Sequence, residues 1–317
     1  MRLNFRFCAL VVATGLLVGC VRSQVPESRW QQISVVPSVP IYALAKVPNK
    51  PQVLYVGTND HGIYETTDGG NTWRSLGLLG QAVVGLAATS DDKVFVVTNY
   101  GLYQYDHGKW LILYLGPNKA LGQPESLVAS GNQLFAAGMR NGVYQFDIKA
   151  EQWVMVGANS WPKGLDASAL VADSHGTLFA GTLDQGIYKY QGKTWRAFNQ
   201  GFPALFLSNI GAFAFGPDGQ LFVATNSAVY AYQNKTWQQL GAHSWPAHKI
   251  PHALYVDANH NVFAAMSRGG LYEYVAASKT WEKFSSSHLP NQSISVISDF
   301  NNKLYVGTGV GLYRYNP

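Results

Sequence analysis

Residues 54–73, LYVGTNDHGIYETTDGGNTW, decide the fold of this chain. The runs LYVGT and GIYETT are short and rich in β-branched and aromatic residues, which favours β-strands. The polar residues 59–62 between them suit a tight turn, and residues 68–71 give a second turn signal before a further strand at Trp73. With an upstream strand over residues 42–45, the stretch predicts a four-stranded antiparallel meander.

The first run recurs six more times, at steps of 40 to 44 residues. A period of about 40 residues with four strands per copy is typical of propeller blades. The sequence therefore predicts an all-β fold, a seven-bladed β-propeller with four-stranded antiparallel blades. The copies of the run begin at Leu54, Val94, Leu134, Leu178, Leu221, Val262 and Leu304.

The repeats also share a side-chain pattern. The second residue of each run is Tyr or Phe, and the residue two places later is small or of modest size, as in Tyr55 and Gly57. Because alternate residues of a strand point to the same face, each ring lies beside a recess. The next strand carries an aliphatic–Tyr pair, such as Ile63–Tyr64, so both of its faces are apolar. We expect neighbouring blades to cover both faces.

A tryptophan marks the fourth strand of six copies, but the seventh copy ends at Pro317 with no room for that strand. The segment SRWQQI, residues 28–33, resembles KTWQQL, residues 235–240. We therefore predict that the N-terminal strand containing Trp30 completes the last blade, so that the propeller spans residues 28–317 and no sheet edge stays open.

The N-terminal segment, residues 1–19, is typical of a secretory signal peptide. Arg2 and Arg6 form a basic region before an apolar stretch that is too short to span a membrane. Its ending, LVGC at residues 17–20, resembles the lipobox of bacterial lipoproteins. The alternative is an ordinary cleaved signal followed by a chance cysteine.

The lipobox resemblance implies that Cys20 becomes the first mature residue and carries acyl chains, with residues 20–27 forming a lipidated linker. Val21 in the second mature position implies sorting to the outer membrane, and leaves open whether the protein faces the periplasm or the cell surface. Several acyl chains give stable anchoring, whereas one chain is marginal.

Composition excludes several kinds of site. Cys8 and Cys20 are the two cysteines, so the folded domain has no disulfide and no thiolate ligand or nucleophile. His243, His248 and His252 have no Asp or Glu among them and match no zinc motif, and we predict no metal and no cofactor. The net charge of +5 is a mild bias rather than a nucleic-acid-binding signature, so no nucleic acid is expected as a partner.

The long connections between blades share one face with the turns between second and third strands, and we interpret this face as the binding surface. Trp161 and Trp245 both lie there in Ser-Trp-Pro segments and could anchor a partner. Alternatively, each folds back as a lid over blade packing. The turns on the same face supply candidate polar partners, namely Tyr100, Arg140, Asp184 and Arg268.

Residues 66–73, TTDGGNTW, resemble the Asp-box (BNR-like repeat) of sialidase-type propellers, S/T-x-D-x-G-x-T-W. The box is a structural turn that also occurs in sortilin-like receptors and photosystem assembly-factor propellers. The repeats LYVGT and GLYRY are similar to those of two-component-regulator sensor propellers. The resemblance covers residues 28–317 and implies the fold rather than an activity.

Sialidases use an arginine triad and a Tyr activated by Glu, and no matching motif is found here, so we expect no enzyme activity and no catalytic residue. The sequence favours a lipid-anchored outer-membrane propeller that binds an envelope protein as a non-catalytic scaffold or accessory subunit. Two alternatives remain open: a glycan-binding lectin or divergent sialidase-like enzyme, and a periplasmic ligand sensor.

Overall fold

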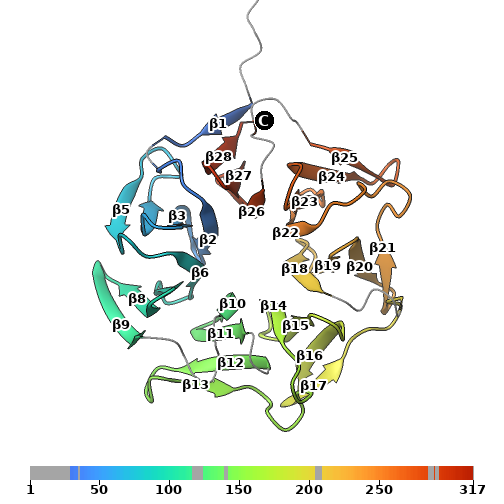
Figure 1. Ribbon diagram of the computed structural model, residues 1–317, viewed down its shortest axis with the longest axis horizontal. Helices are drawn as coiled ribbons and strands as arrows, with labels where there is room; N and C mark the ends of the chain where they lie inside the picture. Colours follow the sequence, from blue (N-terminus) through green and yellow to red (C-terminus); the bar gives the residue numbers. More distant parts are fainter. Residues whose placement is uncertain are drawn as a thin grey trace, which may run out of the picture.

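The computed structural model describes residues 29–34, 36–115, 124–138, 142–203, 209–284, 289 and 293–316. Every element in these ranges is a β-strand. The described residues contain no helix that could span a membrane. The strands form seven antiparallel sheets of four strands each, arranged as a ring around a central axis (Figure 1). The prediction of a seven-bladed β-propeller is therefore confirmed.

Each blade contains four strands, which in the first six blades run in chain order from the axis to the rim; in the last blade β1 takes the place at the rim. The first three blades are β2 (Ile41–Val47), β3 (Lys50–Thr58), β4 (Ile63–Thr66) and β5 (Arg74–Gly77); β6 (Val83–Ala88), β7 (Val94–Thr98), β8 (Gly101–Asp106) and β9 (Lys109–Leu115); and β10 (Pro124–Ser130), β11 (Gln133–Gly138), β12 (Gly142–Asp147) and β13 (Gln152–Met155). The next two are β14 (Ala167–Ala172), β15 (Leu178–Thr182), β16 (Ile187–Gln191) and β17 (Thr194–Ala197); and β18 (Ile210–Phe215), β19 (Leu221–Thr225), β20 (Val229–Gln233) and β21 (Thr236–Gln239). The last two are β22 (Pro251–Val256), β23 (Val262–Met266), β24 (Leu271–Val275) and β25 (Thr280–Lys283); and β26 (Ile294–Phe300), β27 (Lys303–Thr308), β28 (Gly311–Tyr315) and β1 (Trp30–Gln32).

The innermost strands β2, β6, β10, β14, β18, β22 and β26 contact one another around the axis. In every one of them the pairing register with the second strand of the blade shifts across the second residue, which marks a β-bulge. The skipped residues include Tyr42 in β2 and Val84 in β6. A bulge leaves the extra residue outside the ladder and re-aims its side chain. The repeated bulge places these residues at one end of the central channel.

The recess predicted beside the Tyr or Phe ring of the repeated run receives side chains of the neighbouring blade. A Cβ added to Gly57 would lie 2.4 Å from Val83 of the next blade, and one added to Gly181 would lie 2.3 Å from Ile210. Real Cβ atoms do not approach side chains so closely, so these positions require glycine. The small residue in the run therefore sets how tightly adjacent blades pack at the axis.

The N-terminal strand closes the ring as predicted. β1 pairs antiparallel with β28, with Trp30 opposite Tyr315. Trp30 is only 3% exposed, and its ring lies 5.1 Å from that of Tyr315 and 6.5 Å from that of Phe284. The Asn316 backbone N–H donates to the Arg29 carbonyl at 2.7 Å, so the two ends of the described chain meet at one blade.

In four blades the tryptophan of the fourth strand attaches the blade to the one before it. The indole N–H groups of Trp110, Trp195, Trp237 and Trp281 donate to carbonyls of the preceding blade, those of Leu76, Val156, Phe198 and Leu240, at 2.8 to 3.0 Å. The strand begins one residue before the tryptophan in five blades. In blade one it begins one residue after Trp73, at Arg74, because a longer turn precedes it.

Antiparallel order gives the ring two distinct faces. We call the crossover face the side that carries the turns between second and third strands and the connections from one blade to the next. The opposite face carries the turns between first and second strands and between third and fourth strands. β1 begins at the opposite face, because Trp30 pairs with the C-terminal end of β28.

Candidate functional site

The crossover face carries a concentration of exposed apolar side chains. Most of the large hydrophobic residues that remain exposed on the described chain lie there, although they come from several blades. Polar residues are favoured in loops, so apolar side chains in these turns and connections are informative. The members are Tyr42, Leu79, Val84, Tyr100, Leu183 and Ile250.

Four of these residues come from blades one and two. Tyr42 and Val84 are bulge residues of the neighbouring strands β2 and β6, while Leu79 and Tyr100 lie in the connection between these blades and in the β7–β8 turn. The Tyr100 turn is tied to that connection, because the Asn99 side chain accepts from the Ala82 N–H at 3.0 Å. A tied turn holds exposed rings at a low entropic cost, as an interface anchor requires.

Leu183 and Ile250 border a cavity of about 400 Å³ at the crossover-face end of the channel. The bulge residues Ser168 and His252 also line it. The Ser168 hydroxyl donates to the Ile210 carbonyl of the next blade at 2.7 Å, which fixes its position. The channel mouth therefore combines an apolar rim with a polar floor.

Charged groups on the described crossover face are few and of both signs. By contrast, the turns of the opposite face are rich in Asp, Asn and Lys, several of them ion-paired, as in Lys50–Asp92 at 2.8 Å. The crossover face is thus the less charged and more apolar of the two. Its described charged residues are Asp60, Lys163, Asp166, Asp184, Lys249 and Arg268.

Trp161 is 4% exposed and belongs to the core between blades three and four. Its ring lies 5.0 Å from that of Trp195 and 5.3 Å from that of Tyr188, and its indole N–H donates to the Leu165 carbonyl at 2.8 Å. The side chain therefore packs as a lid, which was the second of the two alternatives, and offers no exposed ring to a partner.

Trp245 repeats this arrangement two blades later. Its ring packs edge-on against that of Trp281 at 5.3 Å, and its indole N–H donates to the Lys249 carbonyl at 3.4 Å. In both loops the serine before the loop tryptophan accepts a hydrogen bond from the next blade. The backbone N–H of Trp195 donates to the Ser160 hydroxyl, and that of Trp281 donates to the Ser244 hydroxyl. Trp245 remains half-buried, so part of its surface reaches solvent.

The other predicted site residues are spread around the ring. Tyr100, Asp184 and Arg268 are exposed, in the β7–β8, β15–β16 and β23–β24 turns, and within the described chain no hydrogen bond, ion pair or ring contact joins any two of them. Arg140 and the lipidation residue Cys20 lie outside the described residues. The predicted residues therefore share a face without forming one cluster.

Within the residues that the structure describes, no group of three His, Cys, Asp or Glu side chains could hold a metal ion. Glu65 is a buried charged side chain, and its contacts lie within its own blade. It accepts from the Tyr55 hydroxyl at 2.8 Å and from Arg74 at 2.7 Å. Burial, followed by the bond to Glu65, raises the pKa of Tyr55.

No protein-family model and no curated protein matches this sequence. Solved structures resemble its fold. The extracellular domain of a B. thetaiotaomicron protein, named as a one component system, gives a TM-score of 0.71 at 12% identity over 91% of this chain and 40% of its own. YCF48 bound to D1 peptide gives 0.67 at 18% identity over 92% and 97%, and YCF48 from Cyanidioschyzon merolae gives 0.66 at 16% identity over 91% and 98%.

The chain thus spans less than half of the first structure and nearly all of YCF48. At these identities the likeness shows the propeller fold alone.

Sequence reasoning missed five of the six exposed apolar residues of this face, namely Tyr42, Leu79, Val84, Leu183 and Ile250. Tyr42 and Val84 lie within strands rather than in turns, and the bulge that exposes them leaves no mark in the sequence. The sequence could have identified Leu183, because it lies beside Asp184 in a turn, where an apolar residue is unusual.

Proposed function

We propose that this chain is a lipid-anchored outer-membrane propeller that binds another envelope protein through its crossover face. It acts as a non-catalytic scaffold or accessory subunit. Acylation at Cys20 attaches it to the membrane, and the propeller supplies a rigid surface for the partner.

The observation that carries this proposal is the apolar surface of the crossover face. Protein interfaces have apolar, weakly charged centres in which aromatic and aliphatic anchors are buried on binding. Tyr42, Val84, Leu79 and Tyr100 provide such a group in one sector of the face. The described turns of the opposite face offer no comparable group.

The position of β1 supports an orientation. Eight residues separate Cys20 from Arg29, which limits the tether to about 30 Å even when fully extended. Because β1 begins at the opposite face, that face is held near the membrane and the crossover face points away from it. The partner is then reached from the side distant from the lipid.

Lysines on the opposite face agree with this orientation. Five exposed lysines lie at or next to the outer turns of blades two to six, and none has an ion pair within the described chain. Each cation near an anionic lipid surface contributes about 1 kcal/mol of attraction. These residues are Lys109, Lys149, Lys193, Lys235 and Lys279.

The structural neighbours are in keeping with binding rather than catalysis. YCF48, which has a similar fold, is known with a bound D1 peptide, and the B. thetaiotaomicron domain is extracellular. A glycan-binding alternative relied on the rings of Trp161 and Trp245, but the first is buried and the second packs against Trp281. We therefore place protein binding first and ligand sensing second.

Site-specific photo-crosslinking in cells tests the proposal. A photoreactive phenylalanine replaces Tyr100 on the crossover face, and a matched control replaces Leu111 in β9, since the two side chains are 55% and 56% exposed. We expect a discrete covalent adduct with an envelope protein from position 100 and none from position 111. Adducts of equal yield at both positions, or none at position 100, would contradict the docking face.

Membrane fractionation tests the anchor separately. Cys20→Ala should abolish incorporation of labelled fatty acid and release the protein from the membrane fraction. Retention of both properties would exclude Cys20 as the attachment point, while leaving the crosslinking result to stand on its own.

A further inference from the structure

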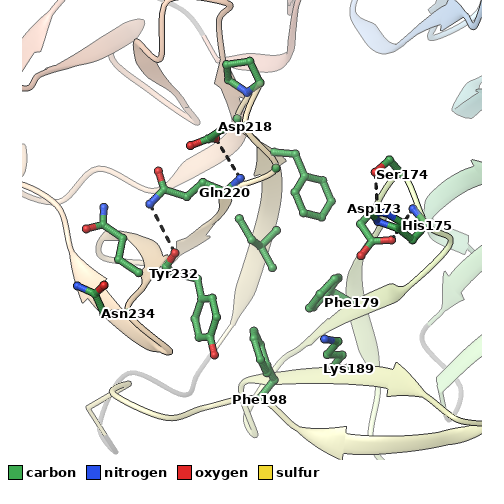
Figure 2. A pocket seen from close by; sticks show the side chains of 16 residues that line it. Asp173, Ser174, His175, Phe179, Lys189, Phe198, Asp218, Gln220, Tyr232 and Asn234 are labelled. Atoms are coloured by element: carbon green, nitrogen blue, oxygen red, sulfur yellow. Dashed lines mark hydrogen bonds between the residues drawn. The ribbon is translucent and has the colours of Figure 1, made fainter.

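The opposite face holds a cavity of about 1010 Å³ between blades four and five. Its walls come from the β14–β15 turn, the β18–β19 turn and the end of β20 (Figure 2). It lies on the other side of the ring from the crossover face, so the proposed protein docking does not use it.

Four aromatic rings make the apolar part of this cavity. The Phe179 ring lies 5.5 Å from that of Phe198 and 6.1 Å from that of Phe215, and Phe198 lies 4.5 Å from Tyr232. Phe198, Phe215 and Tyr232 are half-buried, so the cluster presents ring surface to the cavity. Aromatic surface of this kind favours a planar, apolar ligand body.

A single ammonium group lies over these rings. The Lys189 Nζ is 5.5 Å from the centre of Phe179 and 5.7 Å from that of Phe198, and Figure 2 shows the side chain beside both. No carboxylate of the described chain lies within ion-pair distance of it. Its cross-strand neighbour in β17 is Arg196, another cation.

The equivalent positions in blades one and seven also hold a charged side chain, but there it has polar partners. The same position holds Glu65 in blade one, where Arg74 in the fourth strand supplies the opposite charge at 2.6 Å. In blade seven it holds Arg314, which donates to the Gly70 carbonyl and to the Gln31 side chain. Lys189 has aromatic faces in place of such acceptors. Its charge is therefore available to an anion that enters the cavity.

Two carboxylates at the rim restrict what that anion can be. Asp218 accepts the Gln220 N–H at 3.1 Å and Asp173 accepts the Thr177 N–H at 2.8 Å, each within its own turn. Burial disfavours ionisation of Asp173, but the bonds from Thr177 and His175 outweigh it and lower its pKa. The two rim carboxylates therefore disfavour ligands that carry several negative charges.

We propose that this cavity binds a small aromatic monocarboxylate. The carboxylate pairs with Lys189, and the ring of the ligand packs against Phe198 and Tyr232. A charged hydrogen bond formed in a partly desolvated site is among the stronger polar contacts, and the apolar body adds burial.

Isothermal titration with 3-phenylpropionate tests the proposal on the unacylated propeller. The neutral 3-phenylpropionamide and acetate serve as matched probes that lack the charge and the ring. We expect saturable binding of 3-phenylpropionate, at least tenfold weaker binding of the amide, and no binding of acetate. Lys189→Met should weaken binding of the acid at least tenfold, and Lys189→Arg should largely retain it.

Lys193→Met is the control, because Lys193 is an exposed lysine at the next turn and does not line the cavity. Its binding should equal that of the unaltered protein, and melting curves check that every variant is folded. Equal affinity of Lys189→Met and Lys193→Met for the acid, equal affinity for acid and amide, or no saturable binding of the acid would overturn the proposal.

Discussion

The carboxylate of Asp68 organises the turn before the fourth strand of blade one. It accepts hydrogen bonds from the Thr66 hydroxyl, the Asn71 N–H, and both the N–H and hydroxyl of Thr72, at 2.6 to 3.0 Å. The bonds from Thr72 are the main reason that the pKa of Asp68 falls to about 2. The turn is thus held by an ionised side chain.

This depressed pKa predicts a pH dependence of stability. The folded pKa lies below the unfolded value of 3.8, so the stabilisation is complete above about pH 4 and is lost as the pH falls towards 2. Asp68→Asn should lower the melting temperature by a few degrees at pH 7, and the difference from the unaltered protein should shrink as the pH falls below 4 and vanish below about pH 2. Asp147→Asn, in the corresponding turn of blade three, should show a smaller difference. A pH-independent gap would contradict the account.

Arg74 and Arg196 occupy equivalent positions in blades one and four but differ in what they contact. Arg74 neutralises Glu65, which is 4% exposed, whereas Arg196 has no carboxylate partner in the described chain. Arg74→Met should cost about 1–3 kcal/mol because it strands a buried carboxylate. Arg196→Met should stay within about 0.5 kcal/mol.

Urea denaturation measures both costs. The double variant Glu65→Gln with Arg74→Met should recover part of the loss, since it removes the charge that Arg74 neutralises. Equal costs for the two arginine variants would show that the ion pair contributes little.

Among elements, the fourth strand of four blades is held by its tryptophan both through burial and through one hydrogen bond to the preceding blade. Trp237 donates its indole N–H to the Phe198 carbonyl at 2.8 Å, whereas the buried indole N–H of Trp73 has no partner among the described residues. Tryptophan-to-phenylalanine substitution removes the same atoms from both.

We expect Trp237→Phe to be more destabilising than Trp73→Phe by about 1–2 kcal/mol, because only the former strands a carbonyl and loses a bond. Chemical denaturation of the two variants measures the difference directly. A smaller loss for Trp237→Phe than for Trp73→Phe would show that the inter-blade bond is not what the tryptophan contributes.

The strands and their order could be predicted from sequence because each repeat packs an aromatic ring and a small residue against the neighbouring blade in the same way. Tyr55 and Gly57 show the rule, since the ring needs a recess and the recess admits Val83 of the next blade. Trp161 could not be placed this way. Its burial depends on the angle at which one loop meets Trp195 of another blade, and a sequence pattern does not carry that angle.

At the scale of the whole molecule, the ring separates an apolar face from a charged one. The pairing of β1 with β28 places Arg29, the first described residue, at the charged face. Closure is also where the chain differs from its own repeats. In blade four, residues 191–194 join Tyr190 to Trp195, whereas in blade seven Tyr315 and Trp30 are opposite each other without a covalent turn between them.

A circular permutant tests the closure. The permutant begins at Ser38, runs to Asn316, continues through an inserted Gly-Lys dipeptide to Arg29, and ends at Pro37. The new turn then has four residues between Tyr315 and Trp30, the same number as in blade four. We expect its free energy of unfolding to lie within about 1 kcal/mol of that of the unaltered protein, because joining ends that already touch leaves the core intact.

Deletion of residues 28–34 is the matching negative control, since it removes Trp30 from its contacts with Phe284 and Tyr315 and exposes the edge of β28. Loss of a buried tryptophan alone costs about 3–5 kcal/mol, and an open edge invites aggregation. Urea titration and light scattering should therefore distinguish a stable permutant from an unstable, self-associating deletion. If the permutant unfolds as easily as the deletion, the pairing of β1 with β28 is not what closes the ring. The orientation inferred from the position of β1 would then also be wrong.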